Sequence, residues 1–198
     1  MSVAAQTSRS LQKVWWLRAL AVLAHPRETF AALRDDSDDA AEARQEPVLA
    51  LVILAGIAAV LSTSAAEQAL NDFGLGDSTF AVLSWAFLGG IAYGATVYFV
   101  LGIFIFAIAS GMGTGASFRQ ARHVVAFSAA PLAASLLLVW PVRIAIYGND
   151  LFRMGGSDTG TGARLFDALM AASYLWTLGL VVLGVLELKR SSSSAGIS

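Results

Sequence analysis

The stretch TFAVLSWAFLGGIAYGATVYFVLGIFIFAIAS, residues 79–110, contains no charged side chain. As one α-helix it would be about 48 Å long, more than the roughly 30 Å hydrocarbon core of a bilayer. A single tilted helix whose first turns stand outside the bilayer accommodates this length. The alternative is two short segments hinged at Gly89-Gly90, but that turn would leave backbone groups unsatisfied inside the membrane. We therefore predict one spanning helix here.

Three further apolar stretches are long enough to span a bilayer. Residues 47–66 carry no charge, residues 120–146 contain Pro131, which should kink their helix, and residues 165–187 follow a glycine-rich loop. The composition agrees, since 57% of the residues are hydrophobic and only 14% are charged, against about a quarter charged in soluble domains. The predicted fold is therefore all-α, a polytopic helical membrane bundle over residues 47–188. It has about four spans, or five if residues 79–110 cross twice.

Residues 1–46 are predicted to form a separate cytoplasmic segment. Val14–Ala24 is apolar but too short to span, and its Trp15 and Trp16 favour the headgroup level, so we predict an interfacial helix. The alternative is a signal peptide, but Arg18 would interrupt its apolar region.

Two prolines mark predicted helix starts. Pro26 should open a short helix that ends near Arg34, and Pro47 should open the first span. Between them, Asp35–Glu46 is predicted to be a solvated acidic linker. At the other end of the chain, the serine-rich residues 189–198 are predicted to be a disordered tail.

Arginine and lysine are unevenly divided between the two ends of the predicted helices. Four spans place both termini and the Gly111–Arg122 turn on one side, which the positive-inside rule makes cytoplasmic. We therefore expect a multi-pass membrane protein with both termini in the cytoplasm. The terminal side carries Arg9, Lys13, Arg18, Arg27, Arg34, Arg44, Arg119, Arg122, Lys189 and Arg190, and the other side carries Arg143, Arg153 and Arg164.

The sequence offers no residues that we would assign to catalysis, cofactor binding or metal binding, so we expect a protein that is not an enzyme. It has no cysteine, and its net charge of −1 gives no basic surface for nucleic acid. A proton or ion path requires ionisable groups in the middle of the membrane, and the centres of the predicted spans carry none. Asp167 and Arg143 fall near the predicted non-cytoplasmic ends, where we expect them to form an ion pair that fixes helix packing.

Several motifs in order resemble a known family. They are His25-Pro26 with Thr29-Phe30 and Leu33, then Ser117-Phe118-Arg119-Gln120-Ala121, then Val125–Leu132 around Pro131, and finally Tyr174–Gly184. This order resembles the Yip (Ypt/Rab-interacting protein) domain family in its prokaryotic form.

The resemblance implies a polytopic helical membrane domain with a cytoplasmic N-terminus. For eukaryotic members it also implies partnership with small GTPases, but their acidic-tyrosine-glycine-proline signature is absent here, so small-GTPase binding is not expected. Members typically have five spans, so either a last helix is missing or residues 79–110 cross twice.

Two functions fit these observations. The first is a non-catalytic scaffold or protein-interaction role in the membrane, with the lipid bilayer, other membrane proteins or further copies of the chain as partners. The second is a small permease or channel component, suggested by the glycines of Gly90–Gly94, the Pro131 kink and the serines that flank it. The second function predicts a hydrated cavity beside Ser128 and Ser135.

Overall fold

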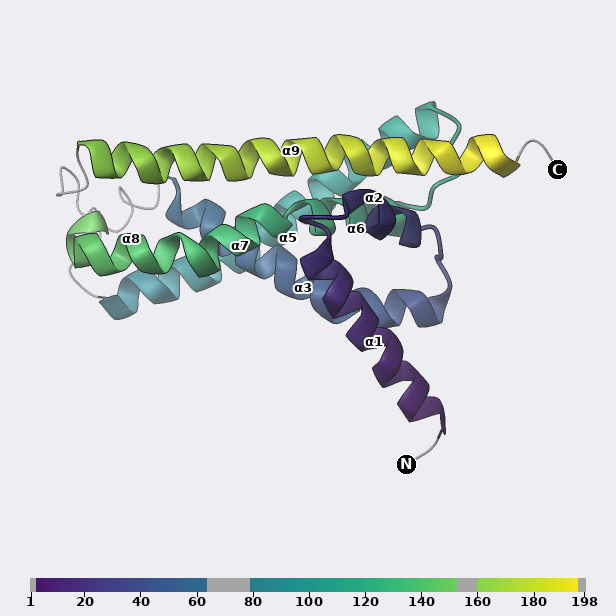
Figure 1. The fold of residues 1–198 in the computed structure, drawn as a ribbon, viewed down its shortest axis with the longest axis horizontal. Coiled ribbons are helices and arrows are strands. Elements are labelled where there is room, and N and C mark those ends of the chain that lie inside the picture. Colours follow the sequence, from purple (N-terminus) through teal and green to yellow (C-terminus); the bar gives the residue numbers. More distant parts are fainter. Residues whose placement is uncertain (1–2, 64–78, 153–159, 196–198) are drawn as a thin grey trace. The chain divides into compact units, whose positions relative to one another are not determined.

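A computed structural model describes residues 3–63, 79–152 and 160–195, and all regular structure in these ranges is helical (Figure 1). This confirms the all-α prediction. Four helical stretches are long and apolar enough to cross a membrane, namely Asp38–Leu61, Phe80–Gly111, Phe118–Tyr147 and Thr161–Arg190. The elements in chain order are α1 (Val3–Ala21), α2 (Pro26–Ala32), α3 (Asp38–Leu61), α5 (Thr79–Gly111), α6 (Phe118–Ser128), α7 (Ala130–Leu138), α8 (Trp140–Tyr147), the 3-10 helix η1 (Gly148–Phe152) and α9 (Thr161–Ala195).

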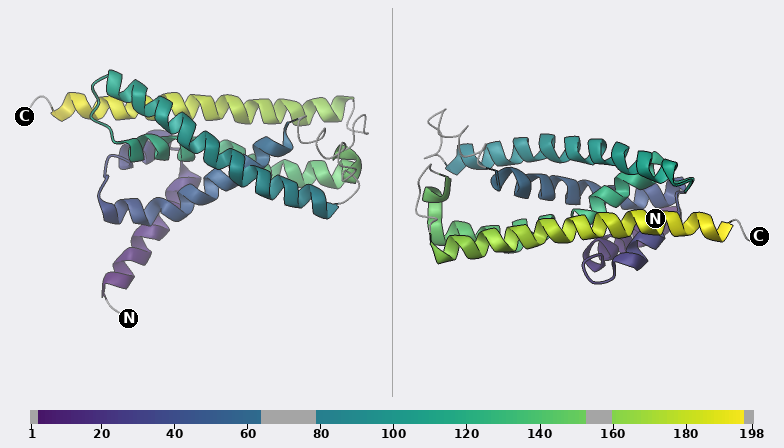
Figure 2. Two further views of the ribbon diagram at one scale, coloured as in Figure 1. Left: turned by 180° about the vertical axis from the view of Figure 1, so that it is seen from behind. Right: turned by 90° about the horizontal axis from the view of Figure 1, so that it is seen from above.

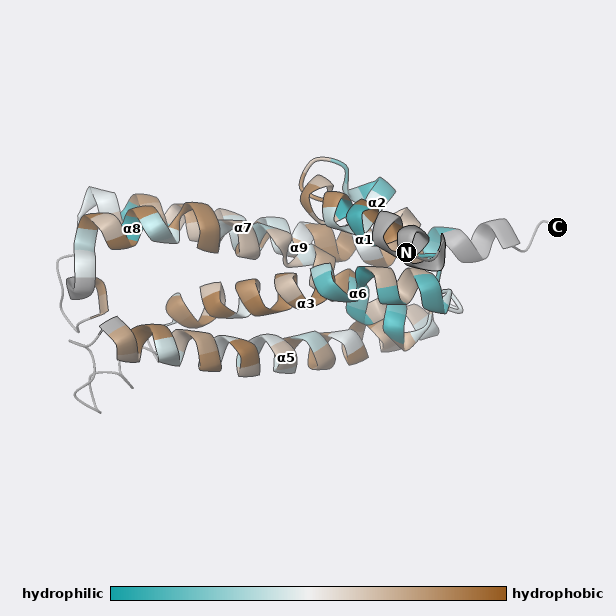
Figure 3. Cartoon of the chain, turned by 90° about the horizontal axis from the view of Figure 1, so that it is seen from below, coloured by the Kyte–Doolittle hydropathy of each residue, from teal (hydrophilic) through white to brown (hydrophobic). Residues whose placement is uncertain are grey.

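Helix α5 runs without interruption through Gly89-Gly90 (Figure 2), so the prediction of one helix is confirmed and the hinged alternative is wrong. Its residues are hydrophobic along most of its length, whereas hydrophilic residues gather on α2 and α6 (Figure 3). A continuous helix keeps every backbone group paired, which a turn inside the bilayer would not.

The stretch from Phe118 to Tyr147 is broken where the sequence predicted a kink. Helix α6 ends at Ser128 and α7 begins at Ala130, with Pro131 as its second residue. Pro131 has no N–H to continue the ladder, and its ring disfavours the preceding turn. A second break before α8 coincides with Pro141, the second residue of that helix.

The expectation that Pro47 begins a helix is wrong. Helix α3 starts at Asp38 and contains Pro47. Ser37 begins it instead, because the Ser37 hydroxyl accepts the Ala40 N–H at 3.4 Å and Asp38 and Asp39 in the first turn suit the positive end of the helix dipole. Most of the predicted acidic linker is therefore helix.

Helix α9 is longer than predicted, from Thr161 to Ala195 rather than 165–187. The disorder expected at 189–198 is wrong for 189–195, and 196–198 lie outside the described residues. No glycine or proline interrupts the sequence between 185 and 195. Arg190 donates to Glu187 at 2.8 Å across one turn, which supports the helix near its end.

The chain folds as two compact units, each assembled from separate stretches. The first unit comprises residues 1–52, 96–130 and 177–198, and the second comprises residues 53–95 and 131–176. Helices α3, α5 and α9 each contribute residues to both.

The core of the first unit forms around α2, α6 and the second half of α9. Phe30, Leu33 and Phe127 are all fully buried. Gly184 lets these helices approach closely, because a Cβ at that position would meet Val124 and lie 3.3 Å from Phe30. Its lack of a side chain is therefore a packing requirement.

In the second unit, α3 and α5 meet backbone to backbone. A Cβ added at Gly56 would meet the carbonyl oxygen of Gly90 and lie 2.9 Å from the Cα of Gly94. A Cβ at Gly90 would lie 2.7 Å from the Cα of Ile57. Small residues permit this approach between apolar helices. Gly90 and Gly94 of α5 therefore serve packing within the chain.

Candidate functional site

The turn between α2 and α3 is fixed first by its own polar groups. The Ser37 N–H donates to the Asp35 carboxylate at 3.1 Å, and the Ser37 hydroxyl caps α3. These bonds leave the Asp36 side chain free to bond elsewhere in the first unit. Short-range bonds of this kind are why Asp and Ser recur in turns.

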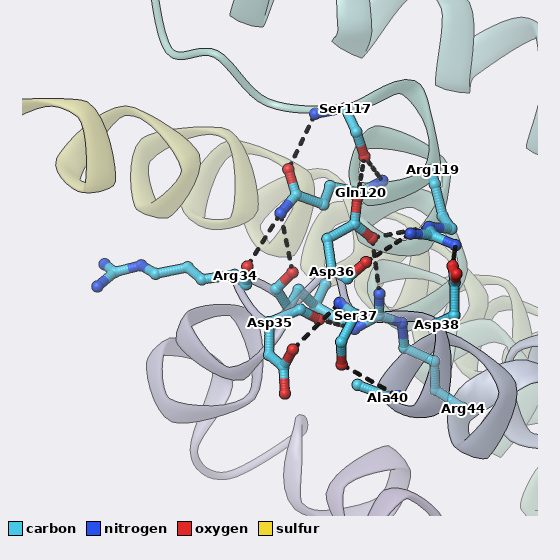
Figure 4. A network of polar contacts seen from close by, with 11 residues as sticks. Arg34, Asp35, Asp36, Ser37, Asp38, Ala40, Arg44, Ser117, Arg119 and Gln120 are labelled. Carbon is cyan, nitrogen blue, oxygen red and sulfur yellow. Dashed lines mark hydrogen bonds and ion pairs between the residues drawn. The ribbon is translucent and has the colours of Figure 1, made fainter. Parts of the chain in front are cut away.

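Asp36 is the centre of a network that joins this turn to the start of α6 (Figure 4). Its Oδ1 accepts from Arg44 Nη2 at 3.0 Å and from Arg119 Nε at 2.8 Å. Its Oδ2 accepts from the Ser117 hydroxyl at 2.6 Å. Arg119 also donates to the Asp36 carbonyl and, at 2.9 Å, to Asp38. We call Asp36, Arg44, Ser117, Arg119 and Gln120 the N-terminal clasp.

Arg44 is the buried cation of the clasp, with no exposed surface. Its Nη1 donates to the Asp35 carbonyl at 2.7 Å, and its guanidinium lies 5.4 Å from the centroid of the Trp15 ring. A buried charge is tolerated only where it is paired and hydrogen-bonded. Asp36 and Trp15 therefore allow Arg44 to occupy the interior.

Ser117 and Gln120 form a capping box at the start of α6. The Ser117 hydroxyl accepts the Gln120 N–H at 3.1 Å, and the Gln120 side chain accepts the Ser117 N–H at 2.9 Å. Gln120 Nε2 also donates to the carbonyls of Leu33 and Arg34, at 3.3 and 3.2 Å. The cap therefore satisfies the ends of two helices, α6 and α2.

The electrostatics of the clasp favour a structural role over general acid–base catalysis. Partial burial alone would raise the pKa of Asp36, but the bonds from Ser117 and Arg119 outweigh it, so the pKa lies below its usual value of 3.8. A carboxylate with a lowered pKa is a weak general base. The Ser117 hydroxyl is already committed to Asp36 and to the α6 cap, so this pair lacks the features of an activated nucleophile.

A second anchor joins the end of α2 to α9. Arg34 Nη2 lies 3.2 Å from Glu187 Oε2, and Glu187 is buried and also accepts from Arg190 at 2.8 Å. A third anchor is Trp15 of α1, which is buried and packs against Phe127 of α6 with ring centroids 5.7 Å apart. The N-terminal segment is thus attached to the rest of the first unit at several independent points.

These anchors use only one face of α1. Trp15 and Ala19 are buried, as is Val22 just after the helix, whereas Trp16, Leu17 and Leu20 are 41%, 58% and 73% exposed. At about 100° per residue the second set shares the opposite face. We call Trp16, Leu17 and Leu20 the outer face of α1.

The second unit contains a cavity of about 450 Å³. The end of α3, the start of α8, the helix η1 and the first half of α9 line it. Its polar contributors include Ser62, Arg143 and Asp167, and its apolar walls include Leu151, Phe152 and Met170. Its volume is within the range of small-molecule sites.

Arg143 and Asp167 meet as the sequence predicted, with Arg143 Nη2 3.8 Å from Asp167 Oδ1. The sequence also predicted a hydrated cavity beside Ser128 and Ser135. Both side chains are buried, and neither lines the cavity just described. Ser135 donates to the Leu132 carbonyl at 2.7 Å, while the Ser128 hydroxyl has no hydrogen-bond partner among the described residues.

Sequence reasoning missed the clasp, since Asp36 and Arg44 were assigned to a solvated linker. One available signal was the S-x-x-Q spacing of Ser117 and Gln120, which marks a capped helix start. Within the ranges that the structure covers, no group of three or more His, Asp or Glu residues could hold a metal ion.

Comparisons with known proteins give one result. The sequence model of the Yip1 domain matches residues 20–197. Neither the curated proteins nor the solved structures give a significant match.

Proposed function

The chain belongs to the Yip1 domain family and is a multi-pass membrane protein, and from this premise we propose that it is a non-catalytic membrane scaffold whose α1 is its protein-binding element. The observation that carries the proposal is the two-sided character of α1. One face is anchored through Trp15, and the outer face is exposed and apolar.

The anchoring supports a presentation role for this helix. Trp15 packs against Phe127, with ring centroids 5.7 Å apart, and the guanidinium of Arg18 lies 4.7 Å from the Trp15 ring centroid. The clasp and the Arg34–Glu187 pair hold the segment that follows α1. A helix that served only as a tether would not need these attachments, whereas a rigid binding element loses less entropy on association.

The chemistry of the outer face indicates the kind of partner. Trp16, Leu17 and Leu20 surround the exposed Lys13 on the helix wheel. An apolar helix face that carries one cation suits an apolar helix with an acidic residue, as found near the membrane ends of other membrane proteins. We therefore propose a membrane-protein partner of that character, with insertion of α1 into the bilayer surface as the competing outcome.

Photocrosslinking tests this proposal in native membranes. A photoreactive side chain at Leu17 or Leu20 should capture the same discrete protein, and one at the buried Ala19 should not. W16S in the Leu20 probe should abolish the product without changing the helix content of the purified chain. Capture of lipid alone from both positions would overturn the proposed partner. Solute movement or turnover by purified protein, abolished by single substitutions, would overturn the scaffold role itself.

We infer that both termini are cytoplasmic. The first unit contains the N-terminal segment, the 111–117 turn and the final part of α9, which agrees with both termini lying on the same side of the membrane. Most of the basic residues also belong to this unit, and basic residues favour the cytoplasmic side. Single cysteines at Ser10 and Ser194 should label only from inside, and those at Asp72 and Ser157 only from outside. The natural chain has no cysteine to interfere. Labelling of Ser10 from outside would reverse the orientation.

A further inference from the structure

Arg122 of α6 is a partly exposed cation of the first unit that has no anionic partner among the described residues. Within those ranges its Nε is buried without a hydrogen-bond partner, and its guanidinium forms no ion pair. Arg119, one turn earlier on the same helix, bonds both Asp36 and Asp38. A guanidinium presents five N–H donors and no acceptor. Arg122 therefore has donors available for a group that supplies acceptors.

Three aromatic rings hold the Arg122 guanidinium in place. Its Cζ lies 4.7 Å from the ring centroid of Phe118, 5.1 Å from that of Phe99 and 5.5 Å from that of Tyr98. We call these three residues the aromatic cage. Gly102 of α5 leaves room for the stem of the side chain, because a Cβ there would meet the Arg122 Cγ. Ring faces attract a cation electrostatically, so the cage positions the guanidinium without giving it a carboxylate or phosphate partner.

The neighbours of Arg122 along α6 place it at the boundary between water and hydrocarbon. Arg119 lies three residues earlier, about 4.5 Å along the helix axis. Its partner Asp38 is 96% exposed, as a charged group outside the bilayer should be. The 111–117 turn precedes α6, and a turn between two spans belongs outside the hydrocarbon. Arg122 therefore lies about one turn inside the solvated groups, within reach of lipid headgroups.

On its other side, Arg122 adjoins an apolar face of α5. Phe99, Ile103 and Phe106 are 47%, 56% and 37% exposed, and their spacing of four and three residues puts them on one side of the helix. The Phe106 ring also packs edge-on against Phe118, with centroids 5.9 Å apart, so this face is continuous with the aromatic cage. A ligand with an anionic head and hydrocarbon chains matches both the cation and the face beside it.

We propose that Arg122 and its aromatic cage bind the phosphate of an anionic phospholipid, whose acyl chains lie against Phe99, Ile103 and Phe106. Guanidinium groups bind phosphate in bidentate geometry, and basic sites between membrane helices bind lipid headgroups. The surrounding bilayer supplies this ligand at high local concentration. Free phosphate carries the same acceptor oxygens, so the test separates the two sources. The site does not involve α1 and is independent of the scaffold function.

Native mass spectrometry of the full chain in a neutral detergent provides the measurement. Dioleoyl-phosphatidylglycerol is titrated, with dioleoyl-phosphatidylcholine and inorganic phosphate as separate arms. The anionic lipid should be retained several-fold more strongly than the zwitterionic one, and phosphate should not compete at equal concentration. Equal retention of the two lipids would overturn the proposal. Binding of phosphate that depends on Arg122, without retention of the anionic lipid, would overturn the lipid assignment.

Three substitutions test which groups bind the lipid. R122Q should weaken retention of phosphatidylglycerol about tenfold or more, because the charge-assisted hydrogen bonds are lost. F118L keeps the charge but removes the nearest ring of the cage, so it should weaken retention several-fold. R27Q is the matched control, because it removes an exposed arginine of the same unit that has no ring contact in the described ranges. It should leave retention unchanged.

The F118L arm keeps the proposal falsifiable if R122Q fails to fold. Unchanged retention in folded R122Q or in folded F118L would overturn the proposal, as would equal losses in R122Q and R27Q. Crosslinking in native membranes tests the competing class of ligand. A photoreactive side chain at the exposed Ile103 should capture phospholipid. Capture of a discrete protein there, lost in R122Q, would assign the cation to an acidic protein partner and overturn the lipid site.

Discussion

In the second unit, α3 and α5 meet backbone to backbone at Gly56, Gly90 and Gly94, whereas in the first unit the segment before α3 is fixed by side chains around Asp36. The glycine contact is short-range packing with nothing charged in it. The clasp consists of directional bonds around a buried guanidinium. The first contact depends on the absence of side chains, and the second depends on each side chain having its partner.

This difference predicts how each contact fails. A backbone contact cannot yield to an added side chain without separating the helices, so its failure should be abrupt. A polar network has several members, so its failure should depend on which member is removed and on how much water reaches the gap.

G56L should be the most damaging single change in either contact. The new side chain would meet the Gly90 carbonyl and the Gly94 backbone, which cannot move without bending α5. We expect a loss of about 3 kcal/mol in the free energy of unfolding, at the upper end for overpacking. Unfolding in mixed micelles with a denaturing detergent would measure it.

Gly179 provides the matched control for G56L. It is also a helical glycine, but a Cβ there would meet nothing within 4 Å. G179L should therefore unfold at nearly the same detergent fraction as the natural chain. Equal losses in G56L and G179L would mean that side-chain bulk anywhere in these helices is harmful, and that the α3–α5 contact has no special role.

D36A should be the most damaging change in the clasp. Among the described residues, it leaves the fully buried Arg44 with the Asp35 carbonyl and the Trp15 ring as its remaining partners. Removing one partner of a buried pair costs about 3–5 kcal/mol. Because the Asp36 side chain is 23% exposed, we expect about 2 kcal/mol after solvent screening. Unfolding curves recorded as for G56L would measure the loss.

Substitutions at Asp38 and Arg44 test this prediction further. Asp38 also bonds Arg119, but its side chain is 96% exposed, so D38A should cost much less than D36A, chiefly through the lost interaction with the α3 dipole. Combining D36A with R44M should recover part of the stability, because the uncompensated buried charge is removed. If the double variant is no more stable than D36A alone, burial of the Arg44 charge is not the reason for the loss.

The same two contacts show what the sequence could predict. Long uncharged stretches such as 79–110, the Pro131 break and the glycines of α5 were predictable, because apolar length, proline and small-residue spacing act locally or repeat along one helix. The Arg143–Asp167 pair was predictable because few charges lie near that end of the predicted spans. In each case the physical cause lies within a short window of sequence.

The clasp was not predictable in the same way. Asp36 and Arg119 are 83 residues apart in the chain, and a run of aspartates has the same composition whether it is solvated or paired. The alanines between Asp39 and Arg44 favour helix, which agrees with the start of α3 at Asp38. The cavity depends on where η1 lies against α9, which no local pattern specifies.

S117A should have a smaller effect than D36A. It removes the hydroxyl that caps α6 and that donates to Asp36 at 2.6 Å, while Arg119 and Arg44 continue to bond the carboxylate. Loss of an N-cap costs about 1 kcal/mol. S173A is the control, since that exposed hydroxyl donates to the Leu169 carbonyl of its own helix. A loss in S173A as large as that in S117A would contradict a specific role for the cap.

The smallest expected effect is the response of the clasp to acid. The pKa of Asp36 is lowered from 3.8 in the folded chain, so its contribution to stability is complete above that value and is lost as pH falls through the folded pKa. Between pH 5 and pH 3, the natural chain should therefore lose more thermal stability than D36N, which has no carboxyl to protonate there. The Ser37 hydrogen bonds also lower the pKa of Asp35, so D36N should retain some acid sensitivity. Parallel acid profiles for the two proteins would mean that Asp36 contributes no pH-dependent stability, and that its arginine partners matter only through packing.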